Sequence, residues 1–387
     1  MNIPKKLLDN INFGLLINVI LICMLGIVTI SNATQALKGG TLKFFEFQII
    51  WTIVGLGLLI ATVLIDYNTI KQYYKLIFFA NLVLLLVVVA LGKVVNGANS
   101  WMKIGTFGIE PSEFMGLSLI IVLAKKIEEY EGNINNLKNI SILFLYAIPP
   151  IILIYMQPNL GMALVLVAIV IGMLFMGGLN FRIFFGGIIA SAAAVLGVWF
   201  SPIQILKVYQ KNRISIFLNP QNDQLGAGYH IMQSKLAIGS GELFGMGLGH
   251  GIISQSGYLP EAQTDFIFSV LGEQFGFIGT CVLVILYALI IFNCLKIARL
   301  AKDKFGDMVV IGVVSMLMFH IVENIGMTIG LMPVAGITLP FMSYGGSSML
   351  TNMIAIGLVL NVRIRKNKIN FSSSRNPRNS VIIMGDN

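Results

Sequence analysis

The sequence predicts an all-α polytopic membrane protein with about ten transmembrane helices and a large ordered extracytoplasmic loop between the seventh and the eighth. Its 387 residues are 56% hydrophobic and only 11% charged, with a mean hydropathy of +0.85, which is too apolar for a soluble domain. Apolar runs close to the twenty-residue spanning length recur along the chain. Residues 201–265 interrupt these runs with glycines, prolines and charged side chains.

We place the predicted spans on the apolar runs. They are Phe13–Asn32, Phe47–Ile65, Leu76–Leu91, Phe114–Ala124, Ile140–Tyr155, Met162–Met176, Ile183–Phe200, Phe266–Leu295, Met308–Leu331 and Ser343–Val362. The first follows Lys5 and Lys6 but continues without a small-residue cleavage site, so we interpret it as a span and not as a signal peptide. The fourth has a short apolar part, and its start is expected inside the preceding Glu-Pro-Ser-Glu-Phe stretch.

The basic residues predict the orientation. A cytoplasmic N-terminus places 18 of the 26 Lys and Arg residues on the cytoplasmic side and 8 outside, so both termini are predicted to be cytoplasmic. The net charge of +9 then reflects topology and contact with membrane lipids, and no nucleic-acid partner is predicted. We expect one transmembrane domain over 1–368, with an extracytoplasmic loop at 201–265, and a basic, disordered cytoplasmic tail at 369–387.

The stretch from Tyr229 to Glu273 is where the sequence predicts the chemistry. It gathers Lys235, Glu261, Asp265 and Glu273 in a Gly-rich setting just before a long apolar run. A connection as long as 201–265 is usually functional or disordered, and its apolar and glycine residues favour an ordered one. The topology places this stretch on the outer face of the membrane.

Asp265 stands where the outer loop enters an apolar helix, a depth at which a carboxylate is costly unless paired, hydrated or functional. One interpretation is an N-cap, with Thr264 or Asp265 bonding the first turn. The other is a general base, since a partly desolvated carboxylate can accept a hydroxyl proton near neutral pH. Both roles are compatible.

Other polar groups have an ordinary interpretation beside a functional one. Near the fourth span, Trp101 suits an interfacial anchor, residues 105–108 a turn and Ser112 a helix cap. Gln157-Pro158-Asn159 predicts a tight turn.

Two further expectations concern the interior of the bundle. His320 and Glu323 lie three residues apart on one helical face and could form a pair. Residues 333–348 are expected to form an outer loop or re-entrant segment, whose backbone groups must be satisfied by protein or water.

Five motifs in this order resemble the SEDS family of membrane proteins. They are WMKIGTFGIEPSEF (101–114), QPNLG (157–161), QSKLAIGSG (233–241), PEAQTDFIF (260–268) and NIGMTIGLMPVAGITLPFMSYGGSS (324–348). The resemblance covers nearly the whole chain, and the segment NIGMTIGLMP is most similar to the RodA branch. It implies a peptidoglycan glycosyltransferase that polymerises lipid II at the outer face of the cytoplasmic membrane together with a class B penicillin-binding protein.

The resemblance also implies site residues. The essential aspartate of the family falls on Asp265, and the glutamate of its Pro-Ser-Glu motif on Glu113; these are the predicted catalytic residues. The predicted substrate-binding residues, which would contact lipid II or the undecaprenyl-pyrophosphate-linked glycan, are Arg213, Gln233, Ser234, Lys235, Glu261, Ser343 and Ser347. Arg213 and Lys235 would meet either lipid headgroups or the leaving pyrophosphate. A divalent cation, Mg or Mn, could share that task, although no compact metal cage is visible in the sequence.

The chain departs from the family pattern at several positions. The usual Gln-Pro-Ser-Glu-Phe-x-Lys has Glu110 and Gly116 here, and the usual Gln-Pro-Asp has Asn159. Gln263 stands where RodA members usually carry His, and Glu242 replaces a usual Gly. Two alternatives to the enzyme stay open. One is a lipid II flippase, in which the same charges would line a path for the headgroup. The other is a non-catalytic scaffold for the penicillin-binding protein, which the departures keep open.

We also expect the transmembrane helix of that partner to dock on spans eight and nine, where Gly326 and Gly330 form a small-xxx-small step.

The predicted orientation can be tested by cysteine labelling. Ser373→Cys should be protected from an impermeant thiol reagent in intact cells, and Asn222→Cys should react, because they are predicted on opposite sides of the membrane. Permeabilised cells provide the control, since both cysteines should then react. Labelling of the tail cysteine from outside would reverse the predicted topology.

Overall fold

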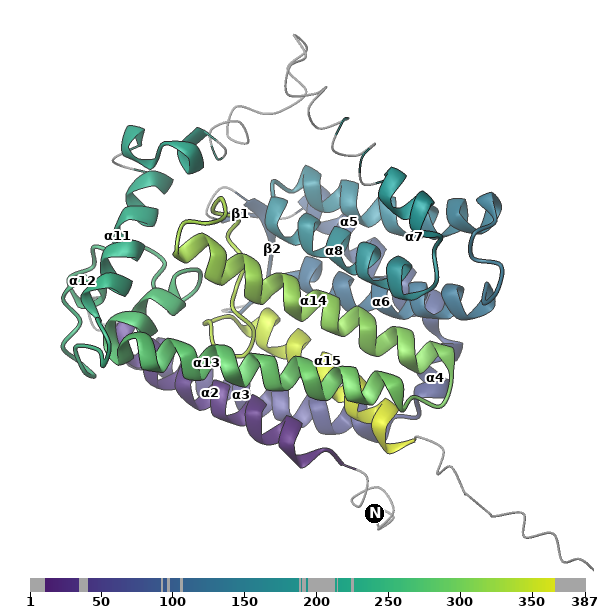
Figure 1. The fold of residues 1–387 in the computed structure, drawn as a ribbon, viewed down its shortest axis with the longest axis horizontal. Helices are drawn as coiled ribbons and strands as arrows, with labels where there is room; N and C mark the ends of the chain where they lie inside the picture. Colours follow the sequence, from purple (N-terminus) through teal and green to yellow (C-terminus); the bar gives the residue numbers. More distant parts are fainter. Residues whose placement is uncertain are drawn as a thin grey trace, which may run out of the picture.

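The computed structural model describes residues 11–34, 41–91, 93–95, 98–104, 107–187, 189, 193, 213, 215–223 and 226–365. Figure 1 shows a bundle of long helices with a smaller helical region beyond one end. Among these residues, nine helices coincide with predicted spans: α2 (Phe13–Ala33), α3 (Thr41–Leu64), α5 (Tyr74–Leu91), α6 (Pro111–Glu129), α7 (Leu137–Met156), α8 (Leu160–Met176), α13 (Ile267–Arg299), α14 (Lys304–Thr328) and α15 (Gly346–Ile364). The predicted seventh span falls mostly outside the described residues, and the predicted tail at 369–387 falls entirely outside them.

Six helices of the described part are long and apolar enough to cross a membrane, namely α2, α3, α7, α13, α14 and α15. Helices α5 and α8 are shorter apolar helices. The fourth predicted span is part of the longer helix α6, which begins inside the Glu-Pro-Ser-Glu-Phe stretch as expected. The chain is therefore a mostly helical, multi-pass membrane protein.

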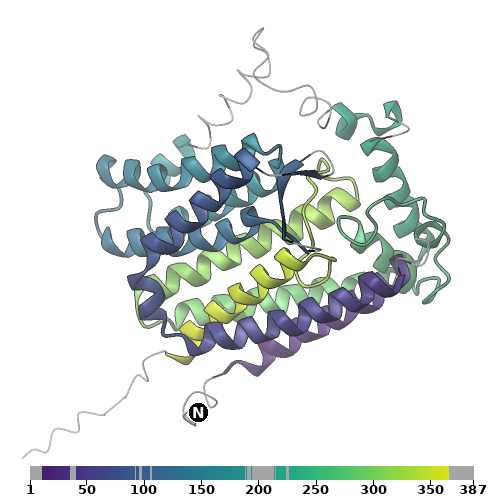
Figure 2. The same ribbon diagram turned by 180° about the vertical axis from the view of Figure 1, so that it is seen from behind.

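Helices α14 and α15 form the centre of the bundle. Helix α14 packs against α6, α8, α13 and α15, while α15 packs along α3, and α2 lies against α13 and α3 (Figures 1 and 2). Glycines allow these close contacts: a Cβ on Gly172 would overlap Ser315 Oγ, and one on Gly312 would lie 2.7 Å from Ile120 Cγ2. Small residues at such crossings are typical of membrane bundles, where close packing substitutes for a hydrophobic driving force.

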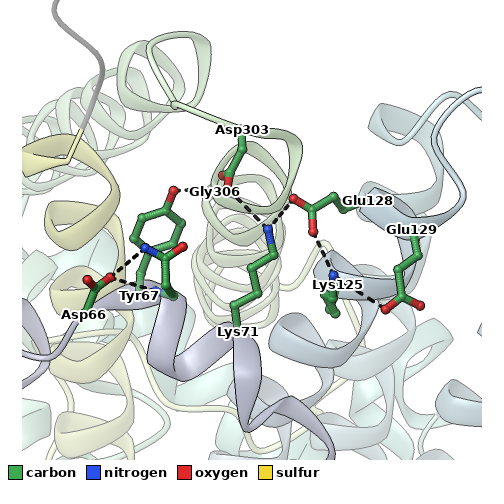
Figure 3. A network of polar contacts seen from close by, with 9 residues as sticks. Asp66, Tyr67, Lys71, Lys125, Glu128, Glu129, Asp303 and Gly306 are labelled. Atoms are coloured by element: carbon green, nitrogen blue, oxygen red, sulfur yellow. Dashed lines mark hydrogen bonds and ion pairs between the residues drawn. The ribbon is translucent and has the colours of Figure 1, made fainter.

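Ion pairs join three elements at one end of the bundle, beside α4 (Tyr67–Gln72). Lys71 Nζ lies 2.5 Å from Glu128 Oε1 of α6 and 3.5 Å from Asp303 Oδ2, while the Tyr67 hydroxyl donates to Asp303 at 3.1 Å (Figure 3). Asp303 also caps α14 through the N–H of Gly306. These contacts tie α4, α6 and α14 together at the end of the bundle that the predicted topology places in the cytoplasm.

The opposite end carries a small antiparallel sheet that the sequence analysis did not predict. Its strands are β1 (Lys93–Val95), β2 (Ala98–Ile104) and β3 (Phe107–Ile109), with Met102 facing Ile109 and Ile104 facing Phe107. Two of the strands, β1 and β3, have only three residues, which is too short to give a periodic pattern. The turn expected at 105–108 lies partly outside the described residues. The elements η1 (Pro220–Asn222), α11 (Ala227–Ser240) and α12 (Ile252–Gln255) lie at the same end.

Helix α13 is interrupted at Gly276, whose backbone is non-helical (φ 65°, ψ −163°). A Gly-rich loop fills the break: Met246 and Gly247 N–H groups donate to the carbonyls of Glu273 and Gln274, at 2.9 and 3.1 Å. In return, the Phe277 N–H donates to the carbonyl of Glu242 at 2.9 Å. The eighth span was predicted as one continuous run, and this break is a correction. It is stable because the loop supplies the hydrogen bonds that the helix gives up.

A second irregular segment, residues 329–345, connects α14 to α15, and its second half is largely buried. Side chains from surrounding elements bond its carbonyls: Asn324 to Ile337 at 2.7 Å, Tyr287 to Pro340 at 2.6 Å, and Gln48 to Ser343 at 3.2 Å. This arrangement confirms the expectation that the backbone of this Gly- and Pro-containing stretch is satisfied by protein groups. The segment forms one wall around Asp265.

The break at Gly276 gives a prediction about stability. Gly276→Ala should destabilise the fold by roughly 2–4 kcal/mol, because its Cβ would overlap the backbone of Gly245 and Leu243 and its φ is unfavourable for alanine. Thermal unfolding of the purified protein would measure the loss. Gly57→Ala is the matched control, since a Cβ there meets nothing within 4 Å and Ala favours the helix. Equal melting temperatures for the two variants would contradict the assigned break.

Candidate functional site

Asp265 immediately precedes α13 and is held by its backbone. The carbonyl of Glu261 accepts the N–H groups of Thr264, Asp265 and Phe266 at 3.2, 3.2 and 3.3 Å. Asn324 Nδ2 of α14 donates to the Asp265 carbonyl at 2.9 Å. The N-cap of α13 is Phe266, without a side-chain cap, so the capping interpretation of Thr264 or Asp265 is wrong. The Asp265 carboxylate is not used to start the helix.

The Asp265 carboxylate is partly buried and faces the 329–345 segment. A Cβ on Gly336 would lie 3.4 Å from its Oδ2 atom. The pKa of Asp265 is raised to about 6, mainly by burial and then by the charge of Glu261, against the lowering effects of the Thr264 hydrogen bond and the Arg213 charge. The side chain remains partly exposed, so a substrate group can reach it. A carboxyl group with this proton affinity can accept a proton near neutral pH.

A second carboxylate, Glu110, lies at the start of α6. Its Oε1 atom accepts hydrogen bonds from Ser112 Oγ at 2.8 Å and from Asn159 Nδ2 at 2.6 Å, and its N–H donates to Ser347 Oγ at 3.0 Å. The pKa of Glu110 is raised to about 7, mainly by burial, against the lowering effect of the two side-chain hydrogen bonds; the charge of Asp265 makes a smaller raising contribution. In the sequence, Glu110 is notable only as a departure from the family pattern.

The capping role expected for Ser112 is wrong, because Glu110 is the N-cap residue of α6 and Ser112 bonds its side chain. The turn expected at residues 157–159 is confirmed. Asn159 is the N-cap of α8, and its Oδ1 accepts the N–H of Met162 at 3.2 Å. The N-termini of α6 and α8 therefore meet at the site.

Glu113 lies in the first turn of α6 with only 6% of its surface exposed. Its charged neighbour is Glu110, and its N–H donates to the Glu110 carbonyl at 3.2 Å. The two glutamates thus belong to one cluster, and Glu110 links that cluster electrostatically to Asp265.

Arg213 and Glu323 complete the charged cluster. Arg213 Nη1 donates to the Ala335 carbonyl at 3.5 Å, and its charge acts on both Asp265 and Glu323. The expected pair between His320 and Glu323 is wrong: His320 Nδ1 bonds the Met316 carbonyl at 2.8 Å. Sequence reasoning missed Glu323 as a site residue, although a carboxylate in the last turns of an apolar helix could have indicated it.

Three predicted substrate-binding serines are used inside the protein. Ser234 is fully buried, bonding Ser269 at 2.6 Å and the Thr328 carbonyl at 2.7 Å. Ser343 donates to the Thr264 carbonyl at 2.6 Å and accepts the Leu339 N–H at 2.8 Å. Ser347 accepts the N–H of Glu110. These hydroxyls hold the walls of the site in place.

The other predicted substrate-binding residues, and Glu273, lie within residues 227–273. Gln233 is partly exposed, and Lys235 and Glu261 are exposed. Lys235 crosses the end of α14, where a Cβ on Gly330 would overlap its Cε atom. Glu273, singled out in the sequence, is fully buried, and its carboxylate accepts the N–H groups of Ile253 and Ser254 at the start of α12. Its role is therefore structural.

The two glycines of the predicted small-xxx-small step are covered by the chain itself. A Cβ on Gly326 would lie 3.0 Å from Met332, and Gly330, which lies beyond the end of α14, is covered by Lys235. The glycines therefore do not form an open step, and docking of a partner helix on spans eight and nine stays a prediction.

A divalent cation was a further expectation for this region. Within the described part of the chain, no group of three His, Cys, Asp or Glu residues could hold a metal ion, and we assign no step to a divalent cation.

The fold and the site define a class of protein: a multi-pass helical membrane protein with a partly buried cluster of carboxylates and an arginine at one end of its bundle. A family of cell cycle proteins that comprises FtsW, RodA and SpoVE has a model that matches residues 12–368. The chain belongs to this family, which confirms the resemblance to the SEDS proteins seen in the sequence.

Relatives from several branches of the family are similar to the chain. Stage V sporulation protein E of Bacillus subtilis is 39% identical, covering 82% of this chain and 86% of its own. Peptidoglycan glycosyltransferase RodA of Treponema pallidum is 33% identical over 92% of this chain and 98% of its own. A chain from a solved peptidoglycan synthase complex that coordinates polymerization and crosslinking superposes with a TM-score of 0.79 and 30% identity, over 91% and 97% of the two chains.

The raised pKa of Asp265 gives a prediction about stability and pH. A carboxyl group whose pKa is higher in the folded than in the unfolded state contributes stability at low pH, and this contribution is lost as pH rises from about 4 through about 6. Asp265→Asn should therefore raise the free energy of unfolding at pH 8 by about 1–2 kcal/mol and change it little at pH 4. Melting temperatures at the two pH values would measure this.

Glu131→Gln is the matched control, because it neutralises an exposed carboxylate at the opposite end of the bundle. A stabilisation by Asp265→Asn that is equal at pH 4 and pH 8 would contradict the proton affinity assigned to Asp265.

Proposed function

We propose that this chain is a peptidoglycan glycosyltransferase that polymerises lipid II at the outer face of the cytoplasmic membrane, with Asp265 as its general base. The names of its relatives support the activity. The observation that carries the assignment is the Asp265 carboxylate, which caps no helix, has its proton affinity raised to the neutral range and remains accessible.

In the proposed reaction, Asp265 accepts the proton of the acceptor GlcNAc 4-hydroxyl as that oxygen bonds the anomeric carbon of the lipid-linked MurNAc. The bond between this carbon and the phosphate oxygen breaks, and undecaprenyl pyrophosphate leaves with the electron pair. Arg213 is suited to meet the developing negative charge, since its charge acts on the same cluster. Lys235 of α11 is exposed where it crosses the end of α14, and it is suited to contact the second phosphate of the leaving pyrophosphate.

An apolar groove supports a lipid-linked substrate. Its volume is about 450 Å³, and it lies between α3, α5, α6 and α15. Its lining extends from Ile65 and Ile70, at the α4 end of the bundle, to Ile109 and Pro111, which flank Glu110 in the sequence. A prenyl chain in this groove would hold its pyrophosphate near the carboxylate cluster. Ligand pockets are usually lined by apolar side chains with a small number of polar groups, and this lining fits that description.

The proposal includes the membrane arrangement and a partner. Ten spans with both termini in the cytoplasm would place Asp265 outside, and the distribution of basic residues supports this orientation. A class B penicillin-binding protein is the proposed partner, because the similar solved structure is a complex that couples polymerization to crosslinking. The exposed apolar side chains of α13, such as Phe277 and Ile285, provide a face for lipid or for a partner helix.

The catalytic assignment is tested by substituting Asp265. Asp265→Asn should reduce lipid II polymerisation by roughly a hundredfold or more, because the amide cannot accept the hydroxyl proton. The protein should still accumulate in the membrane, since the Asp265 side chain caps no helix. The measurement is glycan synthesis from purified lipid II by the reconstituted protein with its partner.

Glu131→Gln serves again as the control and should keep the wild-type rate. If the rate of Asp265→Asn is close to that of the wild type, Asp265 is not the general base, and Glu113 or Glu261 would have to be assigned this role. An inactive wild-type protein that still supports its partner would favour the scaffold instead.

A further inference from the structure

One side-chain hydrogen bond joins the start of α6 to the start of α8. Its two partners are Glu110 and Asn159. Asn159 Nδ2 donates to Glu110 Oε1 at 2.6 Å. An acid and an amide thus meet in one contact, between the N-terminus of α6 and the N-cap of α8.

The surrounding contacts fix the direction of this hydrogen bond. Asn159 Oδ1 accepts the N–H of Met162 at 3.2 Å, which leaves Nδ2 as the group that faces α6. Glu110 Oε1 also accepts from Ser112 Oγ at 2.8 Å, so the site needs an acceptor on the α6 side. Ser347 holds the Glu110 backbone from α15. An acid and an amide satisfy these contacts, whereas two carboxylates would bring oxygen against oxygen.

We propose that Glu110 and Asn159 are a positioning pair, whose acid-to-amide hydrogen bond holds the first turn of α6, with Glu113, against α8. We further propose that the pair works in either order, so that an amide at position 110 with an acid at position 159 would be equivalent. The activity test of this proposal rests on the proposed glycosyltransferase function, whereas its stability test does not.

The electrostatic surroundings explain why a second acid at this contact would be harmful. The charge of Asp265 acts on Glu110, and the charge of Glu110 acts on Glu113. Glu261 and Glu323 belong to the same charged region. Glu261 interacts electrostatically with Asp265, and Asp265 interacts electrostatically with Glu323. Four carboxylates besides Glu110 therefore already share this region with the Arg213 charge.

Another carboxylate at position 159 would add to this charge. It would stay protonated at low pH and could then still donate to Glu110 Oε1. As pH rises it would ionise and repel Glu110, so the harm should increase with pH.

The test is a double-mutant cycle of Glu110→Gln, Asn159→Asp and the two combined. The substitutions suit the local geometry, because Asp is as good an N-cap as Asn for α8. In the double variant, the amide oxygen at position 110 can accept from Ser112 while the amide nitrogen donates to the carboxylate at position 159. In Glu110→Gln alone, the amide oxygen can still accept both hydrogen bonds, and only a two- to threefold loss of rate, roughly, is expected.

Asn159→Asp alone should lower polymerisation about tenfold at pH 8, and clearly less at pH 5.5, with a lower melting temperature. The double variant should return to within about twofold of the wild type at both pH values, and its melting temperature should recover. A residue that serves only in packing would show neither the pH dependence nor the recovery by a second substitution.

Asn136→Asp is the matched control and should behave as the wild type. Asn136 is the N-cap of α7, as Asn159 is of α8, but its side chain is exposed at the other end of the bundle. The control therefore makes the same chemical change at the same kind of helix position without a carboxylate partner.

The proposal is overturned if Asn159→Asp matches the wild type in rate and melting temperature, or if the double variant is no better than Asn159→Asp. If Asn159→Asp fails to accumulate in the membrane, recovery of accumulation by the double variant supports the pair, and its failure overturns it. Wild-type protein that makes no glycan would refute the proposed function, while the melting temperatures of the cycle would still decide whether the pair exists.

Discussion

A peptide group inside a membrane bundle must find its hydrogen-bond partner within the protein or in trapped water, because hydrocarbon offers none. Two irregular stretches of this chain, the break in α13 at Gly276 and the segment at 329–345, depend on meeting that requirement. A Gly-rich loop satisfies the first through backbone groups, and side chains such as Asn324 and Tyr287 satisfy the second. The second stretch then forms a wall of the site, since its Gly336 lies beside the Asp265 carboxylate.

The same requirement explains the chemistry of the site. The polar side chains needed to satisfy irregular backbone also enclose Asp265, since Asn324 bonds both its carbonyl and that of Ile337. A carboxylate enclosed in this way loses hydration, which raises its proton affinity. Rigid walls therefore produce two effects together: they fix the Asp265 backbone, and they shift its pKa toward the range in which a general base works. Structure and reactivity share one cause here.

Much of the fold was predictable because apolar runs dictate membrane helices, and nine predicted spans coincide with described helices. The charged site was less predictable. Asp265 stood out because a carboxylate beside an apolar run is costly. Glu323 was paired with the wrong neighbour, because local spacing indicates His320 whereas the three-dimensional packing supplies Asp265 and Arg213. Contacts between distant segments, such as Asn159 with Glu110, leave no periodic signal in a single sequence.

The departures from the family pattern differ in physical meaning once they are placed in the structure. Glu242 has φ 47° and an exposed side chain, and its carbonyl accepts the Phe277 N–H in the break of α13. Replacing a glycine there costs backbone strain, roughly 1 kcal/mol, but places no new charge in the site. Glu110 and Asn159, in contrast, share one hydrogen bond at the site itself, and Glu110 is compatible with its partner because position 159 carries an amide and not a second acid. Departures therefore have to be judged by the contact they share, since an acid that is tolerated beside an amide would be harmful beside another acid.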